Sequence, residues 1–428
     1  MRNLRKFGIL TVLCAVPVCA QQSGAAQSAA DAPANAAVLE RVRELEDRVI
    51  ALEGQLRQLK SQPPPPSAAA ASAAPEALAA VGAAPGGGGT QAGILGGAGG
   101  SAAKALNPDI SVIGDFIADA GHNSVDPSPS LQMHETELGL QAIIDPYARG
   151  DFFLSFGEEG VTLEEGYTTL TALPASFVVK VGKMRSAFGK VNTLHNHVLP
   201  WVDRPLVTNN LVGGEDGVDD AGVSIQRILP APKGIFLEAT GQLFRGDSGD
   251  LEHPVFHAST ASDVSAVAHL RSYKDITEST NIDIGVSYAR GHNELGSDFL
   301  THLYGVDATL RWKPLRRSIY HSFVGRAEFI WNQRQQLASE QRAFGFYTSG
   351  DYQLGRRWFV GGRYDRSDRT RFANLTDEGG SAVLTYWPSE FAQVRGQYRF
   401  TRYAGNIDAN EFLMQLMFSL GAHGAHPF

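Results

Sequence analysis

The chain has 428 residues and a formal net charge of −8 at pH 7, so it lacks the basic surface that marks nucleic-acid-binding proteins. Both cysteines, Cys14 and Cys19, lie in the first twenty residues, which leaves the rest of the chain without disulfides or thiolate metal ligands. No stretch after residue 20 reaches the ~20 consecutive apolar residues of a membrane-spanning helix.

Residues 1–20 have the pattern of a secretory signal peptide. The basic start "MRNLRK" precedes the apolar "FGILTVLCAVPV", and the small residues of "VCA" favour cleavage after Ala20. A lipoprotein anchored at Cys19 would need a small residue before it, and Val18 does not meet that need. We therefore expect a protein exported to the cell envelope.

Residues 21–37 are expected to be disordered and residues 38–60 to form a coiled coil. Apolar residues alternate there at spacings of three and four, which places them on one seam that needs partner helices. Valine at the a positions with leucine at d leans toward a dimer. An Arg-x-x-x-x-Glu frame around the seam occurs twice and resembles short trimeric coiled coils, so we favour a homotrimer. The residues predicted to trimerise are Arg41, Val42, Leu45, Glu46, Arg48, Val49, Leu52 and Glu53.

Residues 61–106 are predicted to be a linker. The segment consists mainly of Pro, Ala and Gly, as in "QPPPPSAAAASAAPEALAA" and "APGGGGTQAGILGGAGG". Such a composition cannot bury a core, and it makes the linker stiff at its Pro end and flexible at its Gly end.

Residues 107–428 are predicted to form an all-β domain, a 16-stranded antiparallel transmembrane β-barrel. Short alternating segments recur with turn residues between them, and most have the ~9–11 residues of a tilted membrane-crossing strand. The predicted strands are 109–118, 131–144, 149–157, 161–172, 175–183, 217–228, 234–245, 262–272, 281–291, 300–312, 319–332, 341–353, 357–367, 379–387, 391–402 and 410–420.

The connections between these strands are sorted by length. Short turns such as "DPYARG" and "WPSE" follow most even-numbered strands, and longer polar segments such as "GDSGDLEHPVFHAST" follow most odd-numbered ones. "SYKDITEST" is expected to be a long exception on the turn side. Short turns on one rim and long loops on the other are typical of outer-membrane barrels. This predicts the cell outer membrane and its lipid as the location, with the coiled coil in the periplasm.

The two faces of the predicted strands differ in chemistry. "EFLMQLMFSL" (411–420) alternates apolar residues without a break, and "FAQVRGQYRFT" (391–401) sets apolar side chains against Gln and Arg. Large charged residues on the polar face are expected to line water inside the barrel. The final Phe428 resembles the terminal aromatic by which barrel-assembly machinery recognises its clients. The charged residues of the predicted lumen are Glu135, Glu137, Asp307, Arg326, Glu328, Arg363, Arg395 and Arg399.

Signal peptide, short coiled coil, linker, sixteen strands and terminal Phe together resemble the phosphate-selective porin O and P family of outer-membrane proteins. The most specific stretch is "VVKVGKMRSAFGKVN" (178–192), followed by "VDRPLVTNN". The resemblance implies a trimeric barrel without a cofactor that conducts small hydrophilic solutes or ions passively. The chain departs from that family in having few lysines and a net acidic balance, so phosphate is not carried over as the solute.

The connection 184–217 is predicted to narrow the pore. It is the longest connection and follows the fifth strand, whose loop folds into the lumen in sixteen-stranded porins. Acids on the loop facing arginines on the wall would set up a transverse field across the lumen. The predicted constriction residues are His195, His197, Asp203, Arg204, Glu215 and Asp216, and the predicted wall residues are Arg326, Arg363, Arg395, Arg399, Glu135 and Glu137.

Three interpretations of His195 and His197, in "VNTLHNHVLPWVDRP", remain open. In an extended segment they point to the same side and could hold one metal, for which Asp203 or Glu215 would complete the ligand set. They could instead form hydrogen bonds within an ordered loop, or contact the solute. Because the ligand set is incomplete in the sequence, no metal and no cofactor are predicted.

The sequence does not predict an enzyme. Ser186 and Thr193 lack the context that a nucleophile with a histidine base requires. Two functions remain: a passive porin, and a structural tether in which the coiled coil of segment 21–104 holds the outer membrane to peptidoglycan.

Overall fold

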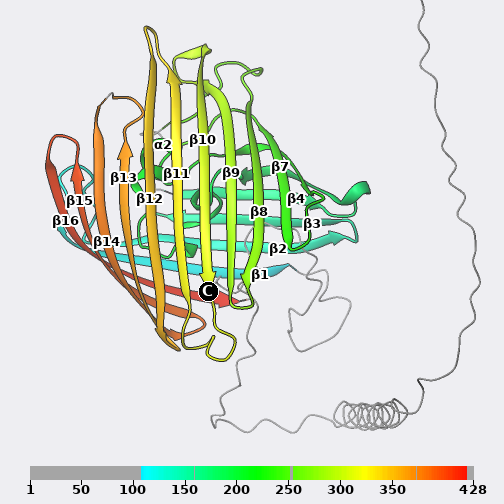
Figure 1. The fold of residues 1–428 in the computed structure, drawn as a ribbon. Helices are drawn as coiled ribbons and strands as arrows, with labels where there is room; N and C mark the ends of the chain where they lie inside the picture. Colours follow the sequence, from blue (N-terminus) through cyan, green and yellow to red (C-terminus); the bar gives the residue numbers. More distant parts are fainter. Residues whose placement is uncertain (1–107, 159, 251–253, 373, 422–428) are drawn as a thin grey trace, which may run out of the picture. The chain divides into compact units, whose positions relative to one another are not determined.

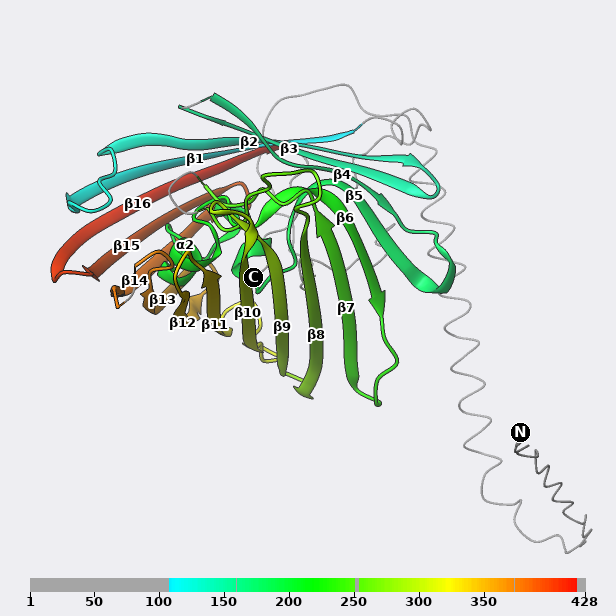
Figure 2. The same cartoon turned by 90° about the horizontal axis from the view of Figure 1, so that it is seen from above.

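The computed structural model describes residues 108–158, 160–250, 254–372 and 374–421. The predicted signal peptide, disordered segment, coiled coil, linker and terminal Phe428 lie outside the described residues. Within them, no helix is both long and apolar enough to cross a membrane. The described residues form sixteen antiparallel strands that pair with their sequence neighbours, and β1 pairs with β16 to close a barrel (Figures 1 and 2).

All sixteen predicted strands are present, and many are longer than the alternation indicated. The hydrogen-bonded ladder continues beyond the apolar band into polar residues, where no alternation marks it. The strands are β1 Asp109–His122, β2 Leu131–Asp145, β3 Ala148–Gly157, β4 Gly160–Leu170, β5 Phe177–Arg185, β6 Asp219–Ile228, β7 Ile235–Phe244, β8 Ser265–Thr277, β9 Thr280–Asn293, β10 Gly296–Trp312, β11 Phe323–Gln335, β12 Glu340–Gly355, β13 Trp358–Asp368, β14 Thr376–Ser389, β15 Ala392–Tyr403 and β16 Ile407–Gly421.

One predicted connection is wrong. "SYKDITEST" is not a long loop, because β8 and β9 remain paired through Asp275 with Asn281 and Thr277 with Thr280. Its polar residues extend the two strands, and the turn is reduced to residues 278–279. The longest connection on the turn rim is instead 313–322, between β10 and β11.

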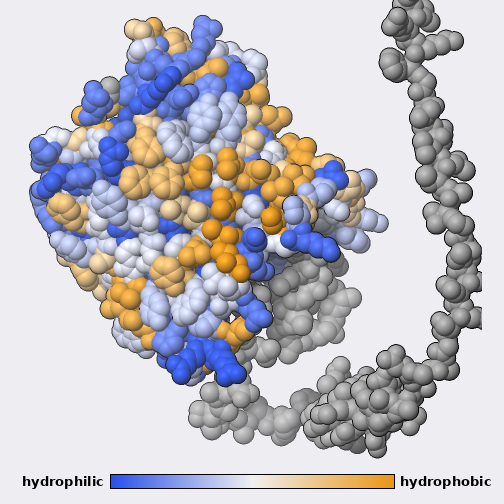
Figure 3. Space-filling model, in the orientation of Figure 1, coloured by the Kyte–Doolittle hydropathy of each residue, from blue (hydrophilic) through white to orange (hydrophobic). Residues whose placement is uncertain are grey.

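The outer and inner faces of the barrel are inverted relative to a soluble protein. On β16, the outward side chains of Leu416 and Phe418 are 40% and 41% exposed. The inward side chains of Glu411 and Gln415 are each 1% exposed. Figure 3 shows apolar side chains concentrated in a band across the strands, with hydrophilic residues at both rims. An apolar exterior over a polar interior fits a barrel surrounded by lipid.

The connection between β5 and β6, residues 186–218, lies inside the barrel, and we call it the lumen loop. It contains η2 Val191–Thr193, η3 Asn196–Val198 and α2 Leu206–Val212, whereas η1 Pro174–Ser176 lies on the turn rim. Figure 2 shows α2 enclosed by β10–β16. Most apolar residues of the loop are buried against the inner wall, and Phe188 and Trp201 are fully buried. The lumen is therefore partly filled by a small apolar core of its own.

Candidate functional site in the barrel lumen

The two ends of the lumen loop are tied together by one side chain. The Asn192 amide donates hydrogen bonds to the backbone oxygens of Ser186 and Val218, each at 3.0 Å. Its oxygen accepts a bond from the backbone N–H of Val218 at 2.8 Å. Because Ser186 begins the loop and Val218 ends it, Asn192 closes the loop at its base.

The loop is next fastened to β11 directly after the Phe-Gly of the sequence motif. The backbone N–H groups of Lys190 and Val191 donate to the Glu328 carboxylate at 3.0 and 3.4 Å. Gly189 adopts a left-handed conformation, with φ of 61°. A Cβ at Gly189 would overlap Oε1 of Glu328. Glycine is required here both by the backbone angle and by the approach of the carboxylate.

A basic anchor fixes the middle of the loop to β13 and β15. Asp203 accepts from the guanidinium groups of Arg363 at 2.9 Å and Arg399 at 3.0 Å, and also from the Gln397 amide. Burial alone would raise the pKa of Asp203, but the two guanidinium groups outweigh it and hold that pKa well below its usual range. Arg395 donates to the backbone oxygen of Trp201 at 3.0 Å.

This contact corrects the predicted opposition of an acidic loop and a basic wall across an open pore. Asp203 touches the wall arginines directly, because the loop reaches the far side of the lumen instead of stopping short of it. The fourth predicted wall arginine, Arg326, pairs with Asp351 of β12 and not with the loop.

Arg204 stabilises the loop from within. It is 4% exposed, and it donates to the Asn196 side chain at 2.9 Å and to the backbone oxygen of Leu194 at 2.7 Å. Burial, followed by the nearby Arg185, lowers the pKa of Arg204 to about 9. Because its hydrogen bonds are made within the loop, the guanidinium group of Arg204 mainly stabilises the fold of the loop.

An acidic anchor lies on β2 and β4, where both histidines of the loop are in contact with carboxylates. Nδ1 of His195 is 2.8 Å from Oε2 of Glu137 and 2.8 Å from Oε2 of Glu164, and its Nε2 is 3.0 Å from Glu165. Burial alone would lower the pKa of His195, but these carboxylates outweigh it and raise that pKa well above its ordinary value. Nδ1 of His197 lies 3.5 Å from Glu135 and 3.5 Å from Glu137.

Glu164 and Glu165 were missed in the sequence because they are consecutive, whereas strict alternation allows only one of two neighbours to face inward. The pairing of β3 with β4 shifts at this point: Phe153 pairs with Glu165, and Leu154 with Leu163. Glu164 is thus the extra residue of a β-bulge, a distortion that redirects side chains. A second bulge, at His134 on β2, has the same effect beside Glu135.

The acids expected to complete a metal site with the histidines lie elsewhere. Asp203 belongs to the basic anchor, and Glu215 is bound by His134 at 2.9 Å and by the Asn196 amide at 2.7 Å. Asp216 is exposed, and its backbone oxygen accepts from Arg185 at 2.9 Å. The structure brings the histidines to Glu135 and Glu137, which the sequence placed on the wall without assigning them to that site.

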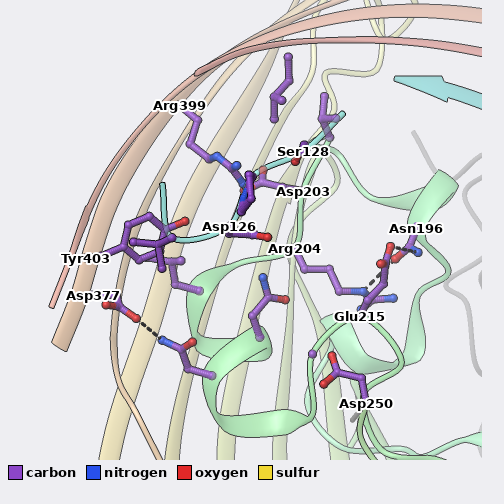
Figure 4. A pocket seen from close by; sticks show the side chains of 18 of the residues that line it. Asp126, Ser128, Asn196, Asp203, Arg204, Glu215, Asp250, Asp377, Arg399 and Tyr403 are labelled. Atoms are coloured by element: carbon purple, nitrogen blue, oxygen red, sulfur yellow. Dashed lines mark hydrogen bonds and ion pairs between the residues drawn. The ribbon is translucent and has the colours of Figure 1, made fainter. Parts of the chain in front are cut away.

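A cavity of about 770 Å³ lies on the long-loop side of the lumen loop. Residues 125–129 and 369–372, from two other long connections, contribute to its lining. Figure 4 shows Arg399, Tyr403 and Asp377 on one side of it and Glu215 and Asp250 on the other. The cavity is hence a vestibule whose lining carries both signs of charge.

Among the comparisons with known proteins, one solved structure supports this architecture. No family model matches the chain. An uncharacterized protein of Aquifex aeolicus (strain VF5) is 28% identical over 391 residues, which cover 76% of this chain and 81% of that protein. A loop-deletion form of OmpT, an outer membrane protein of Vibrio cholerae, has a TM-score of 0.51 at 10% identity, covering 74% of this chain and 100% of its own. The outer membrane channel DcaP of Acinetobacter baumannii has a TM-score of 0.49 at 13% identity, covering 73% and 96%. The likeness to the OmpT structure shows that the chain has the barrel fold of an outer membrane protein.

Proposed function

We propose that the chain is an outer-membrane porin through which small hydrophilic solutes or ions diffuse passively. The observation that carries the proposal is the lumen loop, which is held inside a closed barrel by the acidic anchor on one side and the basic anchor on the other. Because the loop is held on two sides, it keeps one position in the lumen. It would therefore narrow the pore to a defined width instead of closing it intermittently.

The lining supports mixed-charge selectivity in preference to a phosphate pore. The arginines of the lining include Arg399 on β15 and two of the 369–372 loop, and its acids include Asp377 on that side and Glu215 and Asp250 on the other. Positive and negative side chains together orient the dipole of a polar solute as it passes, and neither charge dominates the vestibule. Phosphate binding in the resembled family depends on abundant Lys and Arg, whereas the four arginines of this lining are accompanied by five acids.

Planar-bilayer recordings of the purified full-length protein test the proposal. We expect discrete conductance steps in KCl and a reversal potential that depends on the salt gradient. Heat-denatured protein at the same detergent concentration is the control. Absence of steps above that control would overturn the porin assignment.

We further propose that the porin is a homotrimer joined by the coiled coil in the periplasm, and that Phe428 is read by the barrel-assembly machinery. The repeated Arg–Glu frame of residues 41–53 supports the trimer. A second function, tethering to peptidoglycan, is motivated by the length of segment 21–104, which diffusion through a barrel does not require. Deleting that segment separates the two: unchanged conductance with outer-membrane detachment supports tethering, and an intact envelope contradicts it.

A further inference from the structure

The acidic anchor has features that neither a passive pore nor a simple ion pair explains. Two imidazoles from the lumen loop and carboxylates from two strands point at a common centre inside the barrel. We propose that this centre binds one divalent transition metal of the zinc class through Glu137, His195 and His197, with the fourth position filled by Glu164 or Glu135. The metal would join the loop to the wall.

The distances between the donor atoms fit a tetrahedral site. One donor atom from each of Glu137, His195 and His197 lies within 4.8 Å of the others, and the same holds for Glu135, Glu137 and Glu164. Four histidine–carboxylate donor pairs are 2.8 or 3.5 Å apart. Zinc bonds of ~2.0–2.1 Å in tetrahedral geometry place neighbouring donors about 3.4 Å apart. The pairs at 3.5 Å already match this spacing, and those at 2.8 Å would open by about 0.6 Å.

Glu165 orients His195 for this role. Its carboxylate accepts from Nε2 of His195 at 3.0 Å, which directs Nδ1 at the centre. A carboxylate on the outer nitrogen of a metal-bound histidine is the usual supporting contact in zinc sites. Nδ1 itself is 2.8 Å from both Glu137 and Glu164, yet it has no aligned hydrogen bond among the described residues. One N–H could serve both oxygens only as a bent, three-centre hydrogen bond, whereas one metal could bind all three atoms.

The charge balance also favours a cation. Glu135, Glu137, Glu164 and Glu165 crowd together, and in the described part of the chain the guanidinium group ion-paired with them is that of Arg185, 3.3 Å from Glu164. Glu135 is 5% exposed and Glu137 is 2% exposed, so water screens them little. Buried carboxylates in this number require compensation by protons on the histidines or by a bound metal. The zinc-like geometry and the Glu165 contact favour the metal.

Metal titration of the full-length protein tests the proposal without reference to conductance. Protein purified in detergent is stripped with a chelator, dialysed and titrated with Zn²⁺, and Co²⁺ is added separately for its visible absorption. We expect one metal per chain and a Co²⁺ spectrum of a four- or five-coordinate nitrogen and oxygen site. The paired variant His195→Gln/His197→Gln should lose both. Glu165→Gln should retain the site with affinity about 10–100-fold weaker.

His269→Gln is the matched control, because His269 is a lumenal histidine on β8 whose Nδ1 pairs with Ser287 at 2.8 Å, away from the acidic anchor. It should bind metal like the wild type. Glu137→Gln, nearly identical in shape to the wild type, guards against a folding defect in the histidine variant, and heat-modifiable gel migration checks each barrel. Equal binding by the wild type and the Glu137→Gln and histidine variants would overturn the proposal. So would a wild-type protein that binds no metal, in which case the imidazoles carry protons.

Discussion

If the chain is the proposed porin, Asp203 is the residue that we expect to affect ion selectivity most directly. Its carboxylate neutralises two guanidinium groups, so Asp203→Asn leaves Arg363 and Arg399 with one negative partner fewer. A unit charge about 6 Å from a passing ion in water is worth about 0.7 kcal/mol, or about threefold in permeability. We expect the chloride-to-potassium permeability ratio to rise about threefold, measured by reversal potential in a KCl gradient. Asp126→Asn, a vestibule control without these arginines, should change it less; equal shifts would contradict the assignment.

In the proposed porin, we expect Lys190 to make ion selectivity depend on pH near neutrality. Burial, followed by the nearby Arg271, lowers the pKa of Lys190 to about 8. The ammonium group is charged below that pH and neutral above it, so the lumen becomes less positive as pH rises. We expect cation selectivity to increase between pH 7 and pH 9, again by up to about threefold. Lys190→Met should already be more cation-selective at pH 7 and lose most of the change; an unaltered pH profile in that variant would rule Lys190 out.

At the scale of elements, the contact of the lumen loop with β11 depends on one glycine. Gly189→Ala places a Cβ against the Glu328 carboxylate and forces a left-handed angle on alanine, at a cost of about 1–3 kcal/mol. We expect the loop to detach from β11, giving larger and noisier conductance steps and faster proteolysis within residues 186–218. Gly241→Ala, on β7, is the control, because its added Cβ would meet no atom within 4 Å. Wild-type conductance and protease resistance in Gly189→Ala would show that the Glu328 contact does not hold the loop.

The strands could be predicted from the sequence, and the acidic anchor could not. Along a barrel strand, successive side chains face lipid and lumen in turn, and the sequence shows this as alternating apolar and polar residues. Alternation therefore identified all sixteen strands and placed Arg363, Arg395 and Glu137 inside. The bulges at His134 and Glu164 break that alternation, and they arise from the register between neighbouring strands. Which wall segment meets which loop residue depends on closure of the whole barrel. This is why Asp203 was predicted to face the wall arginines across an open pore, and in one interpretation to complete a metal site, when it contacts Arg363 and Arg399 directly.

At the scale of the whole molecule, the outer face of β16 provides a test of insertion in lipid. A charged side chain on the lipid face costs ~2–4 kcal/mol at the bilayer midplane and ~0–1 kcal/mol near the interfaces. Leu416 lies well inside the exposed apolar face of β16, and Leu420 lies on the same face one residue before the strand ends at Gly421. We expect Leu416→Arg to lower the free energy of unfolding in vesicles by ~2–4 kcal/mol and Leu420→Arg by ~0–1 kcal/mol, measured by urea titration. Because both substitutions add the same group to the same face, a similar cost at the two depths would mean that this face does not meet the hydrocarbon core.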